Sequence, residues 1–172
     1  ESRLLGGRYD EGPPSARPVY GAWNRRLDPY GGAVRFGSAY VRLRPEVTER
    51  STFCFPDSVL DPEDVGGPEL LPRLAGLADA SGADELDDYV EAHVHGGVRF
   101  GADVEAIVLD PCFAGTAVED AAGRLGCTVE FHPGFRASPE DFDPEYRGRA
   151  AVELARQLGE QLTPRVLGQA AR

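Results

Sequence analysis

Hydrophobic and polar positions alternate most clearly between residues 87 and 100, which read DDYVEAHVHGGVRF. A strand is expected over residues 89–95, and Gly96 and Gly97 end it. Since successive side chains of a strand point to opposite faces, one face is apolar and the other is polar. The polar face holds Tyr89, Glu91, His93 and His95. One carboxylate and two imidazoles on one backbone make this strand the first candidate for a site, although a solvated edge strand has the same pattern.

Five other segments have the short apolar or alternating patterns that are typical of strands. They are residues 18–23, 34–43, 51–55, 105–109 and 127–131. Segments 34–43 and 51–55 are joined by the short connection RPEVTER and are expected to pair as antiparallel neighbours. Segment 105–109 reads EAIVL, and this continuous apolar run predicts a buried strand.

Three segments favour helices. Residues 68–78 predict a short helix with a proline in its first turn. Thr116 and Glu119 have the spacing of a capping box, so a helix is expected from there to Gly126. Residues 145 to about 162 have the strongest helical periodicity. The strand–helix–strand order over residues 105–131 is typical of a βα hairpin or a crossover unit.

These elements together predict an α+β fold with a mixed, mostly antiparallel sheet and peripheral helices. At 172 residues the sequence is long enough for one domain with a real core, and residues 1–172 are expected to form it. Within it, residues 1–17 predict an irregular lead-in, and residues 145–172 predict a C-terminal helical segment.

The net negative charge of the protein argues against two classes of binding partner, nucleic acids and anionic membranes. A formal net charge of −11 argues against nucleic acid as a general partner, because backbone phosphates attract basic surfaces. It argues equally against an anionic membrane surface. No apolar run reaches the length of a membrane-spanning helix, and the pattern of these residues predicts no signal peptide.

The three cysteines, Cys54, Cys112 and Cys127, match neither a zinc pattern nor a dense disulfide framework. A reduced, cytoplasmic protein is the simplest interpretation. The sequence begins with Glu1 rather than Met, so a fragment is also expected, including a piece of a larger exported protein. In that case a functional residue would lie upstream.

The polar strand has two chemical interpretations. In the first, His93 and His95 join His132, the third histidine of the sequence, around a zinc ion in a metal-dependent hydrolase or lyase. In the second, Glu91 is a catalytic carboxylate without a metal, and it stabilises a developing oxocarbenium ion. The segment that begins with Ser51 and Thr52 then supplies hydroxyls to the same site.

Four stretches carry a resemblance to a known family. They read RFGSAYVRLRPEVTERSTFCFPDS, DDYVEAHVHGGV, DVEAIVLDPCFAGT and GCTVEFHPGFR. Over most of residues 1 to about 150 the sequence resembles an uncharacterised family of high-GC bacteria that has no established activity. Members of that family often have Gln at the position of His93, so the resemblance implies no metal at the three histidines and less than one zinc per chain. They also have more sequence before the position of Glu1.

That family is in turn distantly similar to mono-ADP-ribosyltransferases that use an arginine, a serine–threonine–serine strand and a glutamate. Ser51 and Thr52 match the hydroxyl strand, with Phe53 in place of its last serine. Glu91 matches the catalytic glutamate, but the usual pair of acidic or amide residues is here Glu91-x-His93. Arg17, just before the segment PVYGA, is the candidate for the arginine.

This second resemblance implies an ADP-ribosyltransferase-like fold that binds NAD as its substrate and transfers or hydrolyses ADP-ribose, with no metal cofactor. It implies that Glu91 is catalytic and that Arg17, Ser51 and Thr52 bind NAD. The acceptor is left open between water, a small molecule and a protein side chain. A third interpretation is a binding module that keeps the fold without turnover, because the second acidic residue of the pair is missing.

Overall fold

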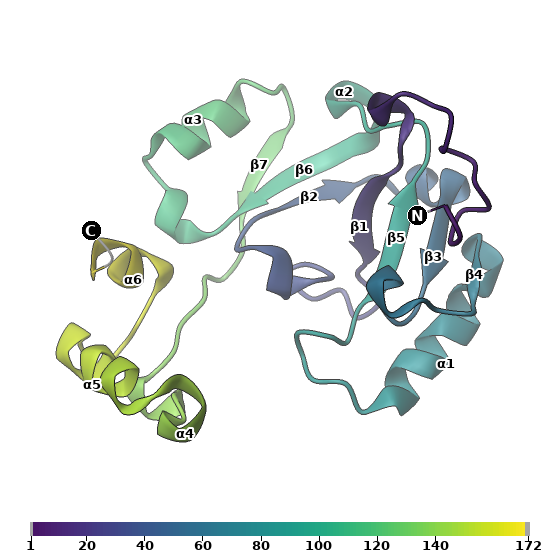
Figure 1. The fold of residues 1–172 in the computed structure, drawn as a ribbon. Helices are drawn as coiled ribbons and strands as arrows, with labels where there is room; N and C mark the ends of the chain where they lie inside the picture. The colour runs from purple at the N-terminus through teal and green to yellow at the C-terminus, as the bar shows by residue number, and fades with distance from the viewer. Residues whose placement is uncertain (1, 171–172) are drawn as a thin grey trace.

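The structure, a computed structural model, describes residues 2–170 as two β-sheets with helices around them (Figure 1). The four-stranded sheet contains, in order, β1 (Val19–Trp23), β5 (Val90–Val94), β3 (Ser51–Cys54) and β4 (Val65–Gly66). The three-stranded sheet contains β2 (Tyr40–Leu43), β6 (Val104–Leu109) and β7 (Thr128–Phe131). Among the strands of residues 2–170, only β6 and β7 pair in parallel. The protein therefore has an α+β fold with mixed, mostly antiparallel sheets, as the sequence pattern predicts.

The strand predicted over residues 89–95 forms β5 and lies inside its sheet, between β1 and β3. Its apolar side chains face the helix α1 (Leu71–Ser81), which covers one side of the sheet. The buried core there consists of Phe53, Phe55, Leu74, Ala78, Val90 and Ala92. Full burial of a side chain such as Leu74 stabilises the fold by roughly 1.5–3 kcal/mol. The polar face of β5 is thereby turned away from α1.

The prediction that segments 34–43 and 51–55 pair as neighbours is wrong. Residues Val34–Phe36 form a 3-10 turn, and only Tyr40–Leu43 is extended, as β2. The connection Pro45–Arg50 is also a 3-10 turn, and it carries the polypeptide from one sheet to the other. β2 pairs instead with β6, where Leu43 packs on the apolar cluster of that sheet.

The crossover unit predicted over residues 105–131 is present. β6 and β7 are parallel neighbours, and α3 (Ala117–Gly123) connects them. Thr116 caps α3 by accepting the Val118 amide, whereas the Glu119 carboxylate accepts the Gly115 amide at 2.7 Å, outside the helix. The second half of the expected capping box is therefore displaced by one residue.

The long helix predicted from residue 145 is broken. It consists of α4 (Pro144–Arg147) and α5 (Arg149–Leu158), separated by Gly148 with a φ of 84°, a conformation that favours glycine. α6 (Pro164–Ala170) follows, and the last two positions of the predicted segment lie outside the described residues. In Figure 1 these three helices lie apart from both sheets. Arg165 joins them to the body of the protein through the Cys112 carbonyl, at 3.1 Å.

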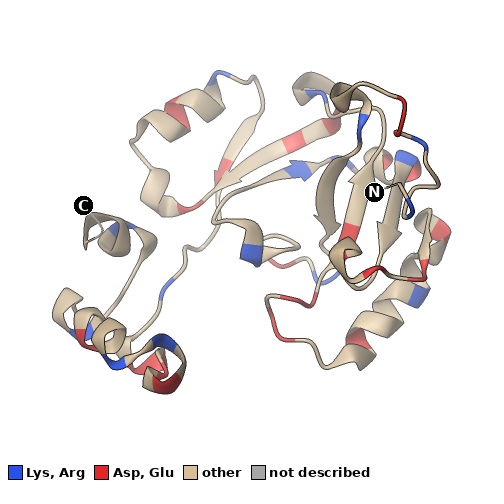
Figure 2. Ribbon diagram, viewed as in Figure 1, with Lys and Arg blue, Asp and Glu red and all other residues tan. Residues whose placement is uncertain are grey.

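Charged positions are distributed over the whole fold. Figure 2 shows the basic positions, in blue, on β2, on α1, on the C-terminal helices and on connecting loops rather than gathered on one element. α2 (Phe100–Asp103) contributes a buried acidic residue, Asp103, which pairs with Arg50 at 3.0 Å. Within residues 2–170, none of the helices combines the length and the apolar character that crossing a bilayer requires.

Candidate functional site

The polar face of β5 meets two rows of residues from its neighbouring strands. Tyr20 of β1 and Thr52 of β3 lie opposite His93. In the next row of the same face, Cys54 of β3 lies opposite Glu91. These partners follow from the antiparallel register, in which directly opposite side chains share a face. β3 and β5 are thus neighbours in one sheet, and Thr52 lies one row along from Glu91 on the same face.

Five of the side chains around this face form a continuous series of hydrogen bonds, which we term the Glu91 network. Its members are Glu91, His93, Thr52, His95 and Tyr9. The Glu91 Oε1 atom is 2.6 Å from His93 Nε2, and His93 Nδ1 is 3.1 Å from the Thr52 hydroxyl. That hydroxyl is 3.0 Å from His95 Nε2, and His95 Nδ1 is 2.5 Å from the Tyr9 hydroxyl. The network therefore runs from the lead-in segment to the carboxylate.

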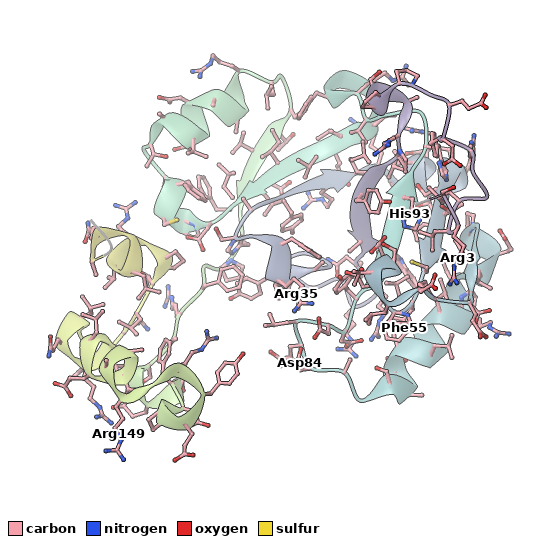
Figure 3. All side chains as sticks on the ribbon, viewed as in Figure 1. Arg3, Arg35, Phe55, Asp84, His93 and Arg149 are labelled. Carbon is pink, nitrogen blue, oxygen red and sulfur yellow. The ribbon has the colours of Figure 1, made fainter. Side chains whose placement is uncertain are left out.

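Burial is high along the network. His93 has no exposed surface, and Glu91 keeps 6% of its surface exposed. Figure 3 shows His93, which it labels, within the four-stranded sheet. Buried polar groups of this kind are costly unless they are hydrogen-bonded, and here both ring nitrogens of both histidines have partners.

The Glu91 carboxylate has a second set of partners on the loop after β3. Its Oε2 atom accepts the Ser58 amide at 3.1 Å, and the neighbouring Asp57 carboxyl group interacts with it. Asp57 in turn accepts hydrogen bonds from the Tyr89 hydroxyl and from the Val59 amide. Glu91 is thus held from two directions, by a histidine on its own strand and by a loop.

Burial, hydrogen bonds and neighbouring charges shift the pKa values of Asp57, Tyr89 and Cys54, which lie around Glu91. Burial alone would raise the pKa of the Asp57 carboxyl, but hydrogen bonds from Tyr89 and Val59 hold that pKa below its ordinary value. Burial and the same hydrogen bond raise the pKa of the Tyr89 hydroxyl, which therefore stays protonated. Burial, followed by the charges of Glu91 and Asp57, raises the pKa of the Cys54 thiol to about 12.

A cavity of about 780 Å³ lies between the two sheets, and Glu91 is in its wall. Its other walls come from β1, from β2 and from the loop over residues 30–39. The aromatic residues of the lining are Tyr20, Tyr30, Phe36, Tyr40, Tyr89 and Phe100. In Figure 3 the labelled Arg35 marks the turn of that loop. An apolar, aromatic cavity with a few convergent polar groups is the usual form of a small-molecule site.

The predicted NAD-binding residues have three different positions. Thr52 is in the Glu91 network. Ser51, one residue earlier on β3, is buried on the opposite face and donates its hydroxyl to the Val47 carbonyl at 2.8 Å. Arg17 is exposed just before β1 and is not in the cavity lining. Alternation along β3 thus separates the two hydroxyl residues that the sequence placed together.

The three histidines do not form one group. His132 follows β7 in the other sheet, where its Nε2 atom is 2.8 Å from the Ser38 carbonyl oxygen and its Nδ1 atom accepts the Gly134 amide. Both ring nitrogens of His132 are therefore engaged away from β5. This arrangement does not fit the three-histidine zinc site considered from the sequence.

One group of potential metal ligands is found among residues 2–170. It consists of Cys54, Glu91 and His93, whose ligand atoms lie within 4.8 Å of one another. Burial and the charges of Glu91 and Asp57 raise the pKa of the Cys54 thiol, and a metal would bind it as the thiolate. Glu91 and His93 are already hydrogen-bonded to each other. An ion bound here would therefore replace the Cys54 proton and the hydrogen bond between Glu91 and His93.

Three residues of the site were not identified from the sequence. They are Tyr9, Asp57 and Ser58. Tyr89, by contrast, lies on the polar face that the alternating pattern predicted. The three unidentified residues come from the lead-in segment and a loop, for which periodicity gives no direction.

Comparison with known proteins identifies the family. No curated protein matches the sequence. A family model described as "Protein of unknown function (DUF3626)" matches residues 1–78 and residues 72–172. The two matches overlap and together cover the whole sequence, so the uncharacterised family expected from the sequence is confirmed. The chain therefore belongs to the DUF3626 family.

Proposed function

We propose that this protein is an NAD-dependent, ADP-ribosyltransferase-like enzyme that transfers or hydrolyses the ADP-ribose of NAD. The observation that carries the proposal is the position of Glu91. Its carboxylate is held by His93 and Ser58 in the wall of an aromatic cavity between two sheets. A fixed carboxylate beside an apolar cavity is suited to a reaction that develops positive charge on its substrate.

The chemistry follows from that charge. When the bond between the ribose C1′ atom and nicotinamide breaks, the bonding electrons leave with nicotinamide and the ribose acquires oxocarbenium character. The Glu91 carboxylate stabilises this cation, as a carboxylate does in glycoside cleavage. An acceptor then forms the new bond to C1′ and loses its proton.

The cavity is compatible with the nicotinamide end of NAD. Its volume of about 780 Å³ lies within the range of ordinary ligand sites. Planar rings favour stacked and edge-on contacts with aromatic side chains, and Tyr20, Phe36 and Tyr89 line the cavity beside Glu91. An aromatic lining of this kind supports the proposal of a nicotinamide subsite.

The NAD phosphates need a cation, and two arginines are candidates. The first is Arg17, which the distant resemblance suggests. The second is Arg136, which lines an adjoining pocket of about 440 Å³. The two pockets share Tyr30, Gly31 and Gly32, so a ligand longer than the first cavity would extend into the second. The guanidinium group of either arginine is suited to a pyrophosphate.

The acceptor remains a choice between water, a small molecule and a protein side chain. The same fold without turnover would be a binding module. NAD binding with and without nicotinamide release separates this alternative from the enzyme. The cavity and the Glu91 carboxylate in its wall support the enzyme rather than the binding module, because a binding module does not require a carboxylate fixed from two sides.

The test is nicotinamide release and NAD affinity, measured on the parent protein and on Glu91→Gln. Glutamine keeps the size of the side chain but not its charge, so turnover should fall by a few hundredfold, equivalent to about 3–4 kcal/mol, at nearly unchanged affinity. Glu105→Gln is the matched control, because Glu105 is an exposed carboxylate on β6 in the other sheet. Thermal melting checks that each variant is folded.

A parent protein that does not bind NAD would refute the proposal. A folded Glu91→Gln protein with full turnover would refute the role of Glu91. NAD binding without nicotinamide release would leave the binding module as the function.

A further inference from the structure

The Glu91 network has a direction that follows from which of its atoms can donate. Its Glu91 end is beside the Ser58 amide, which can only donate, and the Oε1 atom faces His93 Nε2. When Oε1 accepts, His93 carries its proton on Nε2, and Nδ1 of the neutral ring must accept. The Thr52 hydroxyl is the partner of that nitrogen, so it donates to His93.

The same reasoning continues to the other end. A hydroxyl has one proton, and the Thr52 proton is directed to His93, so His95 Nε2 must donate to the Thr52 oxygen. His95 Nδ1 then accepts, and the Tyr9 hydroxyl donates to it. Every bond is satisfied with both rings neutral. Burial, followed by the charge of Arg8 and with a smaller effect of Arg50, lowers the pKa of His95, which agrees with a neutral ring.

Each bond in this series determines the next, because Thr52 joins the two histidines through one proton. If Oε1 of Glu91 did not accept, His93 could carry its proton on Nδ1. Thr52 would then donate to His95, and His95 would donate to Tyr9. The tautomer of His95 therefore depends on Glu91, to which it is linked only through Thr52 and His93 in this network.

We propose that the Glu91 network has a single direction, in which each member donates toward the carboxylate, and that its other four members are positioning residues for Glu91. The tautomers need no substrate to form. Their effect on turnover rests on the proposed function, whereas the direction of the network does not.

The first experiment assigns the tautomers of the histidines in the unmodified protein by ¹⁵N NMR of the ring nitrogens at pH 7.5. His93 and His95 should both carry the proton on Nε2. His132 is an internal reference, because its Nε2 faces the Ser38 carbonyl and its Nδ1 accepts the Gly134 amide. A proton on Nδ1 of either network histidine would overturn the proposed direction.

The second experiment tests whether the direction is transmitted. In Glu91→Ala the network loses its acceptor, so His95 should become a mixture of two tautomers although it does not touch residue 91. The same substitution in a Thr52→Val background should have no further effect on His95, because the linking hydroxyl is absent. Glu105→Ala in the other sheet is the matched control and should change neither histidine. A His95 tautomer that Glu91→Ala leaves unchanged would overturn the coupling.

The third experiment measures the effect on catalysis. Thr52→Val should lower kcat for NAD by about tenfold to a hundredfold through a misplaced carboxylate, at unchanged KM. Thr52→Ser keeps the hydroxyl and should restore both kcat and the tautomers, whereas Thr128→Val on β7 is a control for the loss of a strand hydroxyl. A folded Thr52→Val protein with the kcat of the parent would overturn the positioning role.

The outcomes for the network and for the function are distinguishable. If the parent protein does not use NAD, the proposed function fails, and the tautomers still decide whether the network has its direction. If NAD is turned over while His93 carries its proton on Nδ1, the function stands and the network proposal fails.

Discussion

Thr52 lies directly opposite His93 on neighbouring antiparallel strands, and its hydroxyl oxygen is 3.1 Å from Nδ1 of that ring. The same oxygen is 3.0 Å from His95 Nε2, so one hydroxyl joins two imidazoles of the same strand face. Ser51, the preceding residue, points to the other face. On β3, Ser51 is therefore expected to contribute to stability, whereas Thr52 belongs to the candidate site.

Ser51→Ala is expected to affect stability alone. The substitution removes a buried hydrogen bond to the Val47 carbonyl, so the free energy of unfolding should fall by about 1 kcal/mol. Urea denaturation measures this loss, and nicotinamide release should be unchanged at a temperature where the variant is folded. Loss of turnover in a folded Ser51→Ala protein would show that Ser51 contributes to the NAD site after all.

The two candidate phosphate contacts can be compared directly. Arg17→Ala and Arg136→Ala should leave the fold intact, because both side chains are exposed. The variant that removes the true contact should weaken NAD binding by about tenfold or more, since a hydrogen bond to a charged group contributes roughly 1.5–3 kcal/mol. Titration calorimetry gives both affinities, and nicotinamide alone should bind equally to the two variants. Unchanged NAD affinity in both variants would show that neither arginine contacts the phosphates.

Cys54 should be inert toward thiol reagents in the folded protein. Burial and the neighbouring carboxylates raise its pKa to about 12, so the reactive thiolate is scarce at pH 8. Burial also raises the pKa of Cys112, to about 11. Peptide mass spectrometry after brief treatment with iodoacetamide should find Cys54 unlabelled in the native protein and labelled in urea. Equal rates of labelling in the two conditions would contradict the protected thiol.

His95 should titrate below its ordinary value of 6.5, because burial and the charges of Arg8 and Arg50 disfavour its cation. Unfolding then increases its affinity for a proton, so its contribution to the free energy of unfolding is complete above pH 6.5 and decreases as the pH falls through 6.5. NMR titration should give the lowered midpoint.

His95→Asn is the variant for the linked stability measurement. It removes the titrating ring, so the decrease in unfolding free energy between pH 7.5 and pH 5 should be smaller than in the parent. This interval lies above the range of the carboxylates, such as Asp57, whose lowered pKa affects stability at more acidic pH. A His95 midpoint above 6.5 would reverse the sign of the effect.

The sequence by itself determined the parts of the fold that depend on local pattern. Alternation over residues 89–95 identified β5 and its polar face, and the apolar run over residues 105–109 identified β6. The spacing of Thr116 and Glu119 identified the start of α3. These features were predictable because a strand or a helix presents side chains at a fixed period, whatever surrounds it.

The tertiary structure alone decided which segments meet. β2 pairs with β6 and not with the next strand in the sequence, β3. Gly148 interrupts the segment that helical periodicity predicted to be one helix. Tyr9 of the lead-in segment is hydrogen-bonded to His95, and Ser58 of a loop donates its amide to Glu91. Such contacts join residues far apart in the sequence, and they depend on sheet register and on the closing of loops over a shared core. The strand face could therefore be predicted from its own residues, whereas the partners that turn it into a candidate site could not.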